Sequence, residues 1–193
     1  MRTDWKSRPH NVKAQIGEAV ADRMLIARQF MPYGPVFDGP HPFDRVAIHR
    51  NTLRPCCVEV KTKPCRNNHP DSGFNESQYK VYKTFEYRTG IPVYVVFVDE
   101  RRKQIYGNWL SALEKPYQGA RFEYPSRYCD KHGTEIIYFP LARMEILGTL
   151  EDDCASQLAA LRRSDHDIPQ YELDFGKPPM IPDPPVPYMP PPE

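Results

Sequence analysis

The chain has 193 residues, which suffices for one folded domain with a sizeable core but not for two ordinary domains. Its 26 lysines and arginines almost balance its 25 aspartates and glutamates, so the net charge of +1 gives no overall sign of a polyanionic partner. No apolar run approaches the length of a membrane span, and residues 1–6 lack the apolar core of a signal peptide. We therefore expect a cytoplasmic protein with no membrane partner.

The charges are unevenly placed along the chain. Residues 45–66 contain six lysines and arginines and one acid, Glu59, whereas residues 145–174 contain eight acids and two arginines. A basic middle of this kind is compatible with one face that meets phosphates.

The first predicted element is an amphipathic helix from Lys13 to Met31, preceded by a polar, loosely held arm of residues 1–12. A proline and a glycine directly after Met31 end this helix. Glu18 lies off its apolar stripe, on a side that also carries alanine and leucine. The stripe consists of side chains at steps of three and four residues: Ile16, Val20, Met24, Ala27 and Met31.

Two strands joined by a short hinge come next, and we expect them to pair antiparallel. In the first, Phe43–His49, Asp44 shares a face with two aliphatic side chains. The second, Cys57–Lys63, has β-branched side chains at alternate positions, which puts Glu59 and Lys61 side by side on the other face.

After a polar loop, the pattern predicts a helix from about Asn75 to Thr89, stopped by glycine and proline. The next stretch, Pro92–Val98, is almost continuously apolar, as in a central strand buried on both faces. Because a helix separates it from the Glu59 strand, we expect these two strands to be parallel.

The C-terminal third is predicted to contain a strand at Gln104–Trp109, a short helix at Leu110–Lys115, an edge strand at Glu135–Pro140 and a last helix at Leu150–Arg163. Residues 166–193 form an extended, proline-rich tail, and its last 18 residues contain nine of the 22 prolines. Two interpretations of this tail stay open: a solvated end that docks on nothing, and a docking segment for a proline-recognising partner.

The strand pair brings chemically useful groups together. Asp44 and Glu59 supply hard carboxylate oxygens, which suit Mg²⁺, a cation that takes one or two carboxylates from a protein and keeps several waters. Lys61, beside Glu59, is placed to orient or help deprotonate a water that attacks a phosphodiester.

This arrangement resembles the PD-(D/E)XK nuclease superfamily, with Asp44 as the first acid and Glu59-Val60-Lys61 as the E-x-K element. The resemblance covers about Lys13 to Val98, and it departs from the family pattern at Phe43, where a proline is expected before the first acid. It implies an α/β domain over residues 13–165, with a restriction-endonuclease-like core of order α-β-β-β-α-β, a mixed central sheet and flanking helices.

The resemblance also implies site residues and an activity. Metal binding would fall on Asp44, Glu59 and Val60, and catalytic roles on Glu18, Asp44, Glu59, Lys61 and Gln78, with Tyr82 as a further polar position on the same helix as Gln78. The implied enzyme is a Mg²⁺-dependent deoxyribonuclease, with Mn²⁺ as a substitute, acting as an endonuclease in phage or bacterial DNA processing, recombination or repair. A homodimer would suit the cutting of two strands.

Lys63 and Arg66 directly follow the motif strand, in a loop that also contains Asn67, Asn68 and His69. Their cationic side chains predict contacts with phosphates and salt-dependent binding of nucleic acid. Ordinary solvated loop polarity is the alternative.

The acids of the motif have competing interpretations. Asp38 rivals Asp44 as the first acid, although turn residues surround it. Asp44 and Glu59 could instead pair with Arg45 or Arg50 at the surface.

The two helical positions are equally open. Glu18 could be an ordinary first-turn acid that the helix dipole favours. Gln78 stands three residues after Asn75, so it could simply close a capping box.

The five cysteines are an odd number in a chain longer than a disulfide-stapled scaffold, which predicts reduced thiols. Two cysteines and two histidines are nevertheless a zinc ligand set, and a structural zinc at non-standard spacing stays an alternative for Cys65, His69, Cys129 and His132.

The sequence therefore predicts a metal-dependent nuclease that acts on DNA. The alternative is a non-catalytic nucleic-acid-binding or assembly protein that keeps the fold. Binding of a divalent cation at the carboxylates distinguishes the two.

Overall fold

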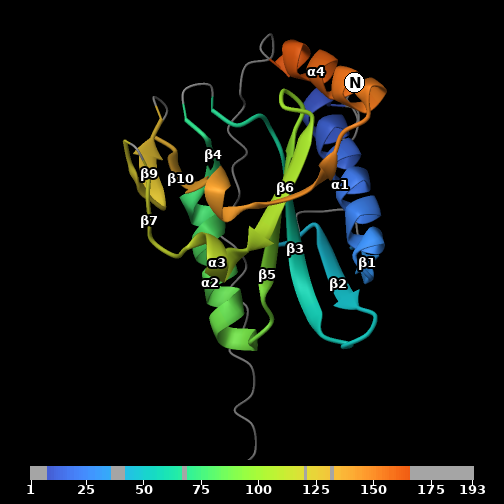
Figure 1. The fold of residues 1–193 in the computed structure, drawn as a ribbon, viewed down its shortest axis with the longest axis vertical. Helices are drawn as coiled ribbons and strands as arrows, with labels where there is room; N and C mark the ends of the chain where they lie inside the picture. The colour runs from blue at the N-terminus through green and yellow to red at the C-terminus, as the bar shows by residue number, and fades with distance from the viewer. Residues whose placement is uncertain (1–7, 36–41, 67–68, 120, 131–132, 166–193) are drawn as a thin grey trace, which may run out of the picture.

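The centre of the computed structural model, which describes residues 8–35, 42–66, 69–119, 121–130 and 133–165, is a six-stranded mixed sheet (Figure 1). In the order in which they lie side by side, its strands are β1 (Phe30–Tyr33), β2 (Arg45–His49), β3 (Pro55–Thr62), β5 (Val93–Asp99), β6 (Gln104–Trp109) and β11 (Glu145–Thr149). β3 and β5 are parallel, and the other neighbours are antiparallel.

Helices and a second sheet cover the two faces of the central sheet (Figure 1). One face carries α1 (Pro9–Ala27) and α4 (Asp152–Asp165), and the other carries α2 (Glu76–Thr89) and the short α3 (Leu110–Leu113). None of the described helices is long and apolar enough to cross a membrane.

The second sheet lies on the α2 side. Its strands, in spatial order, are β4 (Asp71–Asn75), β10 (Glu135–Pro140) and β9 (Ser126–Cys129). A hairpin of β7 (Tyr117–Gln118) and β8 (Glu123–Tyr124) adjoins it, and a 3₁₀ helix, η2 (Leu141–Arg143), leads from β10 to β11.

The order α1-β1-β2-β3-α2-β5 is the α-β-β-β-α-β order that the resemblance implies, so the predicted fold class is confirmed. The antiparallel pairing of β2 with β3 and the parallel relation of β3 to β5 are confirmed as well. β4 lies between β3 and α2 in the chain, but it leaves the central sheet and pairs with β10.

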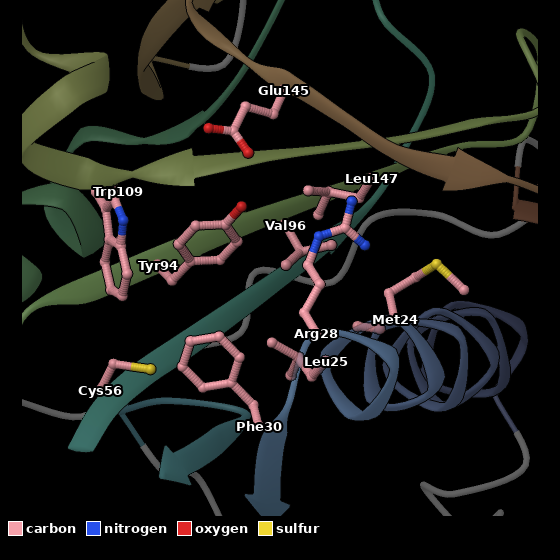
Figure 2. Close-up of a pocket in the computed structure, with 11 residues that line it drawn as sticks. Met24, Leu25, Arg28, Phe30, Cys56, Tyr94, Val96, Trp109, Glu145 and Leu147 are labelled. Atoms are coloured by element: carbon pink, nitrogen blue, oxygen red, sulfur yellow. The ribbon is translucent and has the colours of Figure 1, made fainter. Parts of the chain in front are cut away.

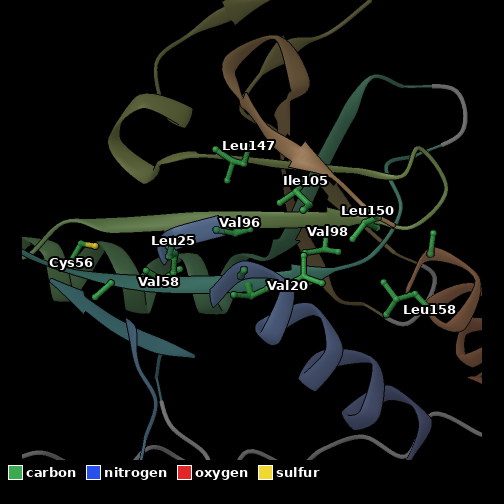
Figure 3. Packing of buried hydrophobic residues seen from close by; sticks show 14 residues of the cluster. Val20, Leu25, Cys56, Val58, Val96, Val98, Ile105, Leu147, Leu150 and Leu158 are labelled. Carbon is green, nitrogen blue, oxygen red and sulfur yellow. The ribbon is translucent and has the colours of Figure 1, made fainter. Parts of the chain in front are cut away.

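β3 and β5 form the middle of the protein because both of their faces are buried. On one face, Val58 and Val96 pack with Val20 of α1 and Leu158 of α4 (Figure 3). Burial of each such side chain stabilises the fold by about 1.5–3 kcal/mol. On the opposite face, Phe97 and other strand residues pack against α2 and the second sheet.

A cavity of about 170 Å³ opens on the α1 face of the central sheet (Figure 2). Phe30, Tyr94 and Trp109 line it, and the rings of Tyr94 and Trp109 meet edge to face at 4.9 Å. Arg28 and Glu145 supply its charged groups.

The first helix begins and ends earlier than the sequence predicts. It starts at Pro9, because proline fits the first helical position, so part of the predicted arm is helical, while residues 1–7 lie outside the described part of the chain. It ends at Ala27, because Gln29 adopts a left-handed φ of 65°, and the following residues form β1.

The buried side of α1 also differs from the predicted apolar stripe. It consists of Lys13, Gly17, Val20, Ala21 and Leu25, whereas Ile16 and Met24 of the predicted stripe are half-buried. Gly17 lies on this side and meets Thr62 of β3, so the side that packs on the sheet is the one that permits this close approach.

The prediction that Glu135–Pro140 is an edge strand is wrong. This segment is β10, which lies between β4 and β9 in the second sheet. Its two partners, β4 and β9, are short strands in segments for which no strand is predicted, and β11 is a third such strand.

Gly17 sets the distance between α1 and β3. A Cβ atom at this position would lie 1.7 Å from Thr62 Oγ1 and 2.9 Å from Thr62 Cβ, so no rotation of the threonine side chain removes the overlap. The helix residue that follows, Glu18, is therefore held at the depth that this contact allows.

We expect Gly17→Ala to destabilise the protein by about 1–3 kcal/mol because α1 must move away from β3. This direction is opposite to the gain of about 1 kcal/mol that alanine normally gives inside a helix. Thermal unfolding measures the effect. Gly34→Ala is the matched control, since a Cβ there meets atoms no closer than 3.7 Å. An equal or higher melting temperature for Gly17→Ala would show that the close approach is absent.

Candidate active site

The register between β2 and β3 brings two carboxylates together. Arg45 pairs with Val58, so the same register places Asp44, the residue before β2, opposite Glu59. The backbone N–H of Val60 donates a hydrogen bond of 2.7 Å to Asp44 Oδ2. This bond fixes the Asp44 carboxylate beside β3, on the face that carries Glu59.

Lys61 joins this strand to α2. Its ammonium donates to Glu59 Oε1 at 2.5 Å and to Gln78 Oε1 at 3.0 Å, and it lies 5.7 Å from the ring centre of Phe74. Asn75, the N-cap of α2, makes no side-chain capping hydrogen bond. Gln78 therefore serves Lys61 rather than a capping box.

Glu59 is a buried acid, with 5% of its surface exposed. Burial raises its pKa to about 6; the Lys61 ammonium opposes this shift and the Asp44 carboxylate adds to it. The buried hydroxyl of Tyr82 donates to Glu59, and burial followed by the Glu59 charge raises the pKa of the tyrosine. Such a perturbed acid beside a cation is typical of functional sites.

Glu18 meets the site through Arg45. The Arg45 guanidinium donates to Glu18 Oε2 at 2.9 Å, to Asp22 Oδ1 at 2.9 Å and to the backbone carbonyl of Asp44 at 2.6 Å. Its two acids hold the pKa of Arg45 above the ordinary value, although burial opposes them. The side chain that the sequence offered as a surface partner for Asp44 thus binds two acids of α1.

Arg45 and Asp22 are candidate functional residues that the sequence analysis missed. Two signals were present in the chain: Arg45 is adjacent to the first acid, and Asp22 follows Glu18 by one helical turn. Neither signal is specific without the fold.

The two predicted nucleic-acid-binding residues lie in different surroundings. Lys63 follows β3 directly, and desolvation together with the charge of Lys61 lowers its pKa to about 8. Arg66 binds the buried carboxylate of Asp71, with Nε 2.7 Å from Oδ1, and its guanidinium lies 3.7 Å from the ring centre of Tyr138. Lys63 therefore lies near Lys61 and also near Arg66, which is in the loop before β4 and packs against the second sheet.

Some predicted positions fall on residues that the structure does not describe. Asp38, the rival first acid, Asn67 and Asn68 lie outside the described ranges. His132 of the zinc alternative does too. All five cysteines are free thiols; among the zinc candidates, Cys65 is buried and Cys129 is exposed.

The donor set at Asp44 and Glu59 fits Mg²⁺. Val60 has one oxygen to offer, its backbone carbonyl, beside the two carboxylates. In the described ranges, no group of three or more histidines, cysteines or acids is placed to bind a metal. Two carboxylates are nevertheless what Mg²⁺ takes from many proteins, and a cation would relieve the repulsion between Asp44 and Glu59.

The cavity in Figure 2 is not part of this site. Its wall includes Val96 and Leu147, which belong to the core on the α1 face of the sheet. Glu59 and Lys61 point to the α2 face.

Several solved structures are similar to this chain, including the following two. One is Hjc, a Holliday junction resolvase from the archaeal hyperthermophile Archaeoglobus fulgidus, at 17% identity and a TM-score of 0.40, covering 64% of this chain and 86% of that one. The other is D212, a nuclease from a fusselovirus, at 12% identity and a TM-score of 0.37, covering 86% and 98%. No family model and no curated protein matches the sequence.

We expect Lys61→Ala to destabilise the protein by about 1–3 kcal/mol at pH 8, because it leaves the buried Glu59 carboxylate without its cation. The loss should shrink toward pH 5. The pKa of Glu59 in the folded protein is already raised from 4.5 to about 6 and rises further without Lys61, so the acid protonates as the pH falls and the penalty disappears.

Denaturant unfolding at the two pH values, in chelator, measures this difference. Lys83→Ala is the control, since Lys83 is more exposed and pairs with Glu86 and Glu114 away from the site. A loss that is equal at both pH values would contradict the assignment of a buried, charged Glu59.

Proposed function

We propose that this protein is a Mg²⁺-dependent deoxyribonuclease that hydrolyses DNA phosphodiester bonds, and that it is an endonuclease of the compact type found in phages and bacteria. One observation carries the proposal. Lys61 is bonded to a buried carboxylate, Glu59, and a second carboxylate, Asp44, is fixed directly before the neighbouring strand by a hydrogen bond from Val60. Two carboxylates can hold a divalent cation that offsets charge on a phosphodiester, and an ammonium beside them can orient the attacking water.

The roles follow from the contacts. Asp44, Glu59 and the backbone carbonyl of Val60 would hold Mg²⁺ or Mn²⁺, which would offset charge on the phosphoryl oxygens. Lys61 has three donor hydrogens, and two of them point to Glu59 and Gln78. The third is available for the attacking water or for a phosphoryl oxygen.

Supporting residues hold these groups in place. Gln78 fixes the Lys61 ammonium, and Tyr82 fixes the Glu59 carboxylate. Arg45 ties Glu18 to the backbone of Asp44, so Glu18 would act on the position of the first acid. Lys63, beside Lys61, would contact the phosphates of the substrate.

We expect the purified protein to nick supercoiled plasmid and to cut branched DNA with Mg²⁺, and chelator to abolish the activity. Asp44→Asn, Glu59→Gln and Lys61→Ala should each lower the rate about 100-fold or more, since each removes a group in contact with the reaction. Lys83→Ala should cut at the wild-type rate. Cleavage that persists in each of the three site variants would come from a contaminating nuclease and would contradict the proposal.

We also expect a divalent cation to bind without DNA. Titration calorimetry with Mn²⁺ should show binding that Asp44→Asn weakens at least tenfold, because one of two carboxylate ligands is lost. Asp152→Asn is the control, since Asp152 is an exposed acid that pairs with Lys103. No binding, together with no cleavage of DNA or RNA in Mg²⁺ or Mn²⁺, would leave the non-catalytic nucleic-acid-binding protein as the better explanation.

A further inference from the structure

The outer face of the second sheet carries aromatic side chains that the proposed catalytic residues do not use. In the sheet register, Tyr128 of β9 lies opposite Ile136 of β10, and the next outward position of β10 is Tyr138. Ile137 and Phe139 alternate with them and point into the core. Tyr128, Ile136 and Tyr138 therefore form one outward surface, the tyrosine face.

Arg66 extends this surface. Its guanidinium lies 3.7 Å from the ring centre of Tyr138 and is held there by Asp71, which is completely buried and also accepts a 2.9 Å hydrogen bond from Tyr124. Because Asp71 neutralises it, Arg66 offers a planar stacking surface more than a free charge. Asp71 is buried and Arg66 is 28% exposed, so the pair holds the guanidinium in place while part of it stays open to solvent.

Tyr128 of this face and one further ring, Phe122, are open to solvent. Tyr128 is 56% exposed and Phe122 is 41% exposed. The Phe122 ring meets His69 edge to face at 4.9 Å, and His69 lies two residues before Asp71 in the chain. Large exposed aromatic side chains around a fixed arginine are the elements of a stacking surface.

The tyrosine face and the candidate active site share β4, which presents alternate residues to the two of them. β4 contributes to both: Phe74 turns inward to Lys61, and the next residue, Asn75, is exposed beside Ile136. Arg127 of β9 bonds Glu76 at 3.1 Å, two residues before Gln78. Arg127 is 56% exposed, so its charge is open to a phosphate backbone that passes the N-terminal end of α2.

We propose that the tyrosine face binds unpaired nucleotides of the substrate by base stacking, an inference whose ligand class rests on the proposed nuclease function. Bases stack on aromatic side chains and on arginine planes presented by a sheet, and such binding tolerates any base because every base has a π-face. The face thus selects DNA that carries a single-stranded segment next to the bond that is cut.

The test is fluorescence anisotropy in chelator, so that no cleavage occurs, with a blunt duplex, the same duplex with a single-stranded overhang, a free single strand of DNA and an RNA of the same sequence. We expect Tyr128→Ala to weaken binding of the overhang and of the single strands about 5- to 100-fold and to leave the blunt duplex within about twofold. Tyr128→Phe keeps the ring and should bind within about threefold of wild type. The RNA arm shows whether the face also reads the sugar.

Tyr87→Ala is the matched control, since Tyr87 is an exposed tyrosine (92%) near the other end of α2. Melting temperatures confirm that each variant folds. The proposal is overturned if Tyr128→Ala weakens all ligands equally, if it changes none, or if wild type does not bind the single-stranded probes. Selective loss in a protein that cuts nothing would retain the stacking face and remove the nuclease function, whereas cutting with no selective loss would do the reverse.

Discussion

The ammonium of Lys61 connects β3 to α2, and the arrangement of the site depends on this connection. It compensates a carboxylate, Glu59, that is almost entirely removed from water, and it receives a second acceptor from Gln78. Burying such a pair rarely stabilises a protein relative to apolar side chains of similar volume, because both ions lose their hydration. A buried, perturbed acid beside a cation is typical of functional sites. The Asp44 carboxylate raises the pKa of Glu59 further, whereas the hydrogen bond from Tyr82 lowers it.

Contacts on the α1 face of the central sheet also position the site. Gly17 lets the helix approach β3 closely, which brings Glu18 and Asp22 within reach of Arg45. Arg45 in turn donates to the backbone carbonyl of Asp44. A displacement of α1 would therefore shift Asp44 through the Arg45 side chain. This coupling exists although α1 and the Glu59 carboxylate lie on opposite faces of the central sheet.

The sequence predicts the parts of the fold in which burial follows a simple period. The alternation in β3 and the apolar run of β5 reflect two buried faces, and their parallel pairing follows from the helix between them. β1 is not predicted because Met31 continues the apolar period of the helix by coincidence. In the structure, the left-handed conformation of Gln29 ends the helix before Met31. β4 and β9 are not predicted because each is short and pairs only with β10. This partner is distant in the chain from β4, and a turn separates it from β9.

The sequence predicts which residues lie near the site, but it does not decide the role of Gln78. The position of this residue fits two different interactions. A capping box and a contact with Lys61 both require a glutamine three residues after Asn75, and only the packing of α2 against β3 decides between them. The helix gives up a capping hydrogen bond from Asn75, which ordinarily contributes about 1 kcal/mol. A missing helix cap is a departure from local sequence preference, and such departures are expected at functional sites. β4 turns Phe74 toward Lys61 and Asn75 toward solvent. The junction between β4 and α2, where the cap is missing, therefore also connects the site to the outer face of the second sheet.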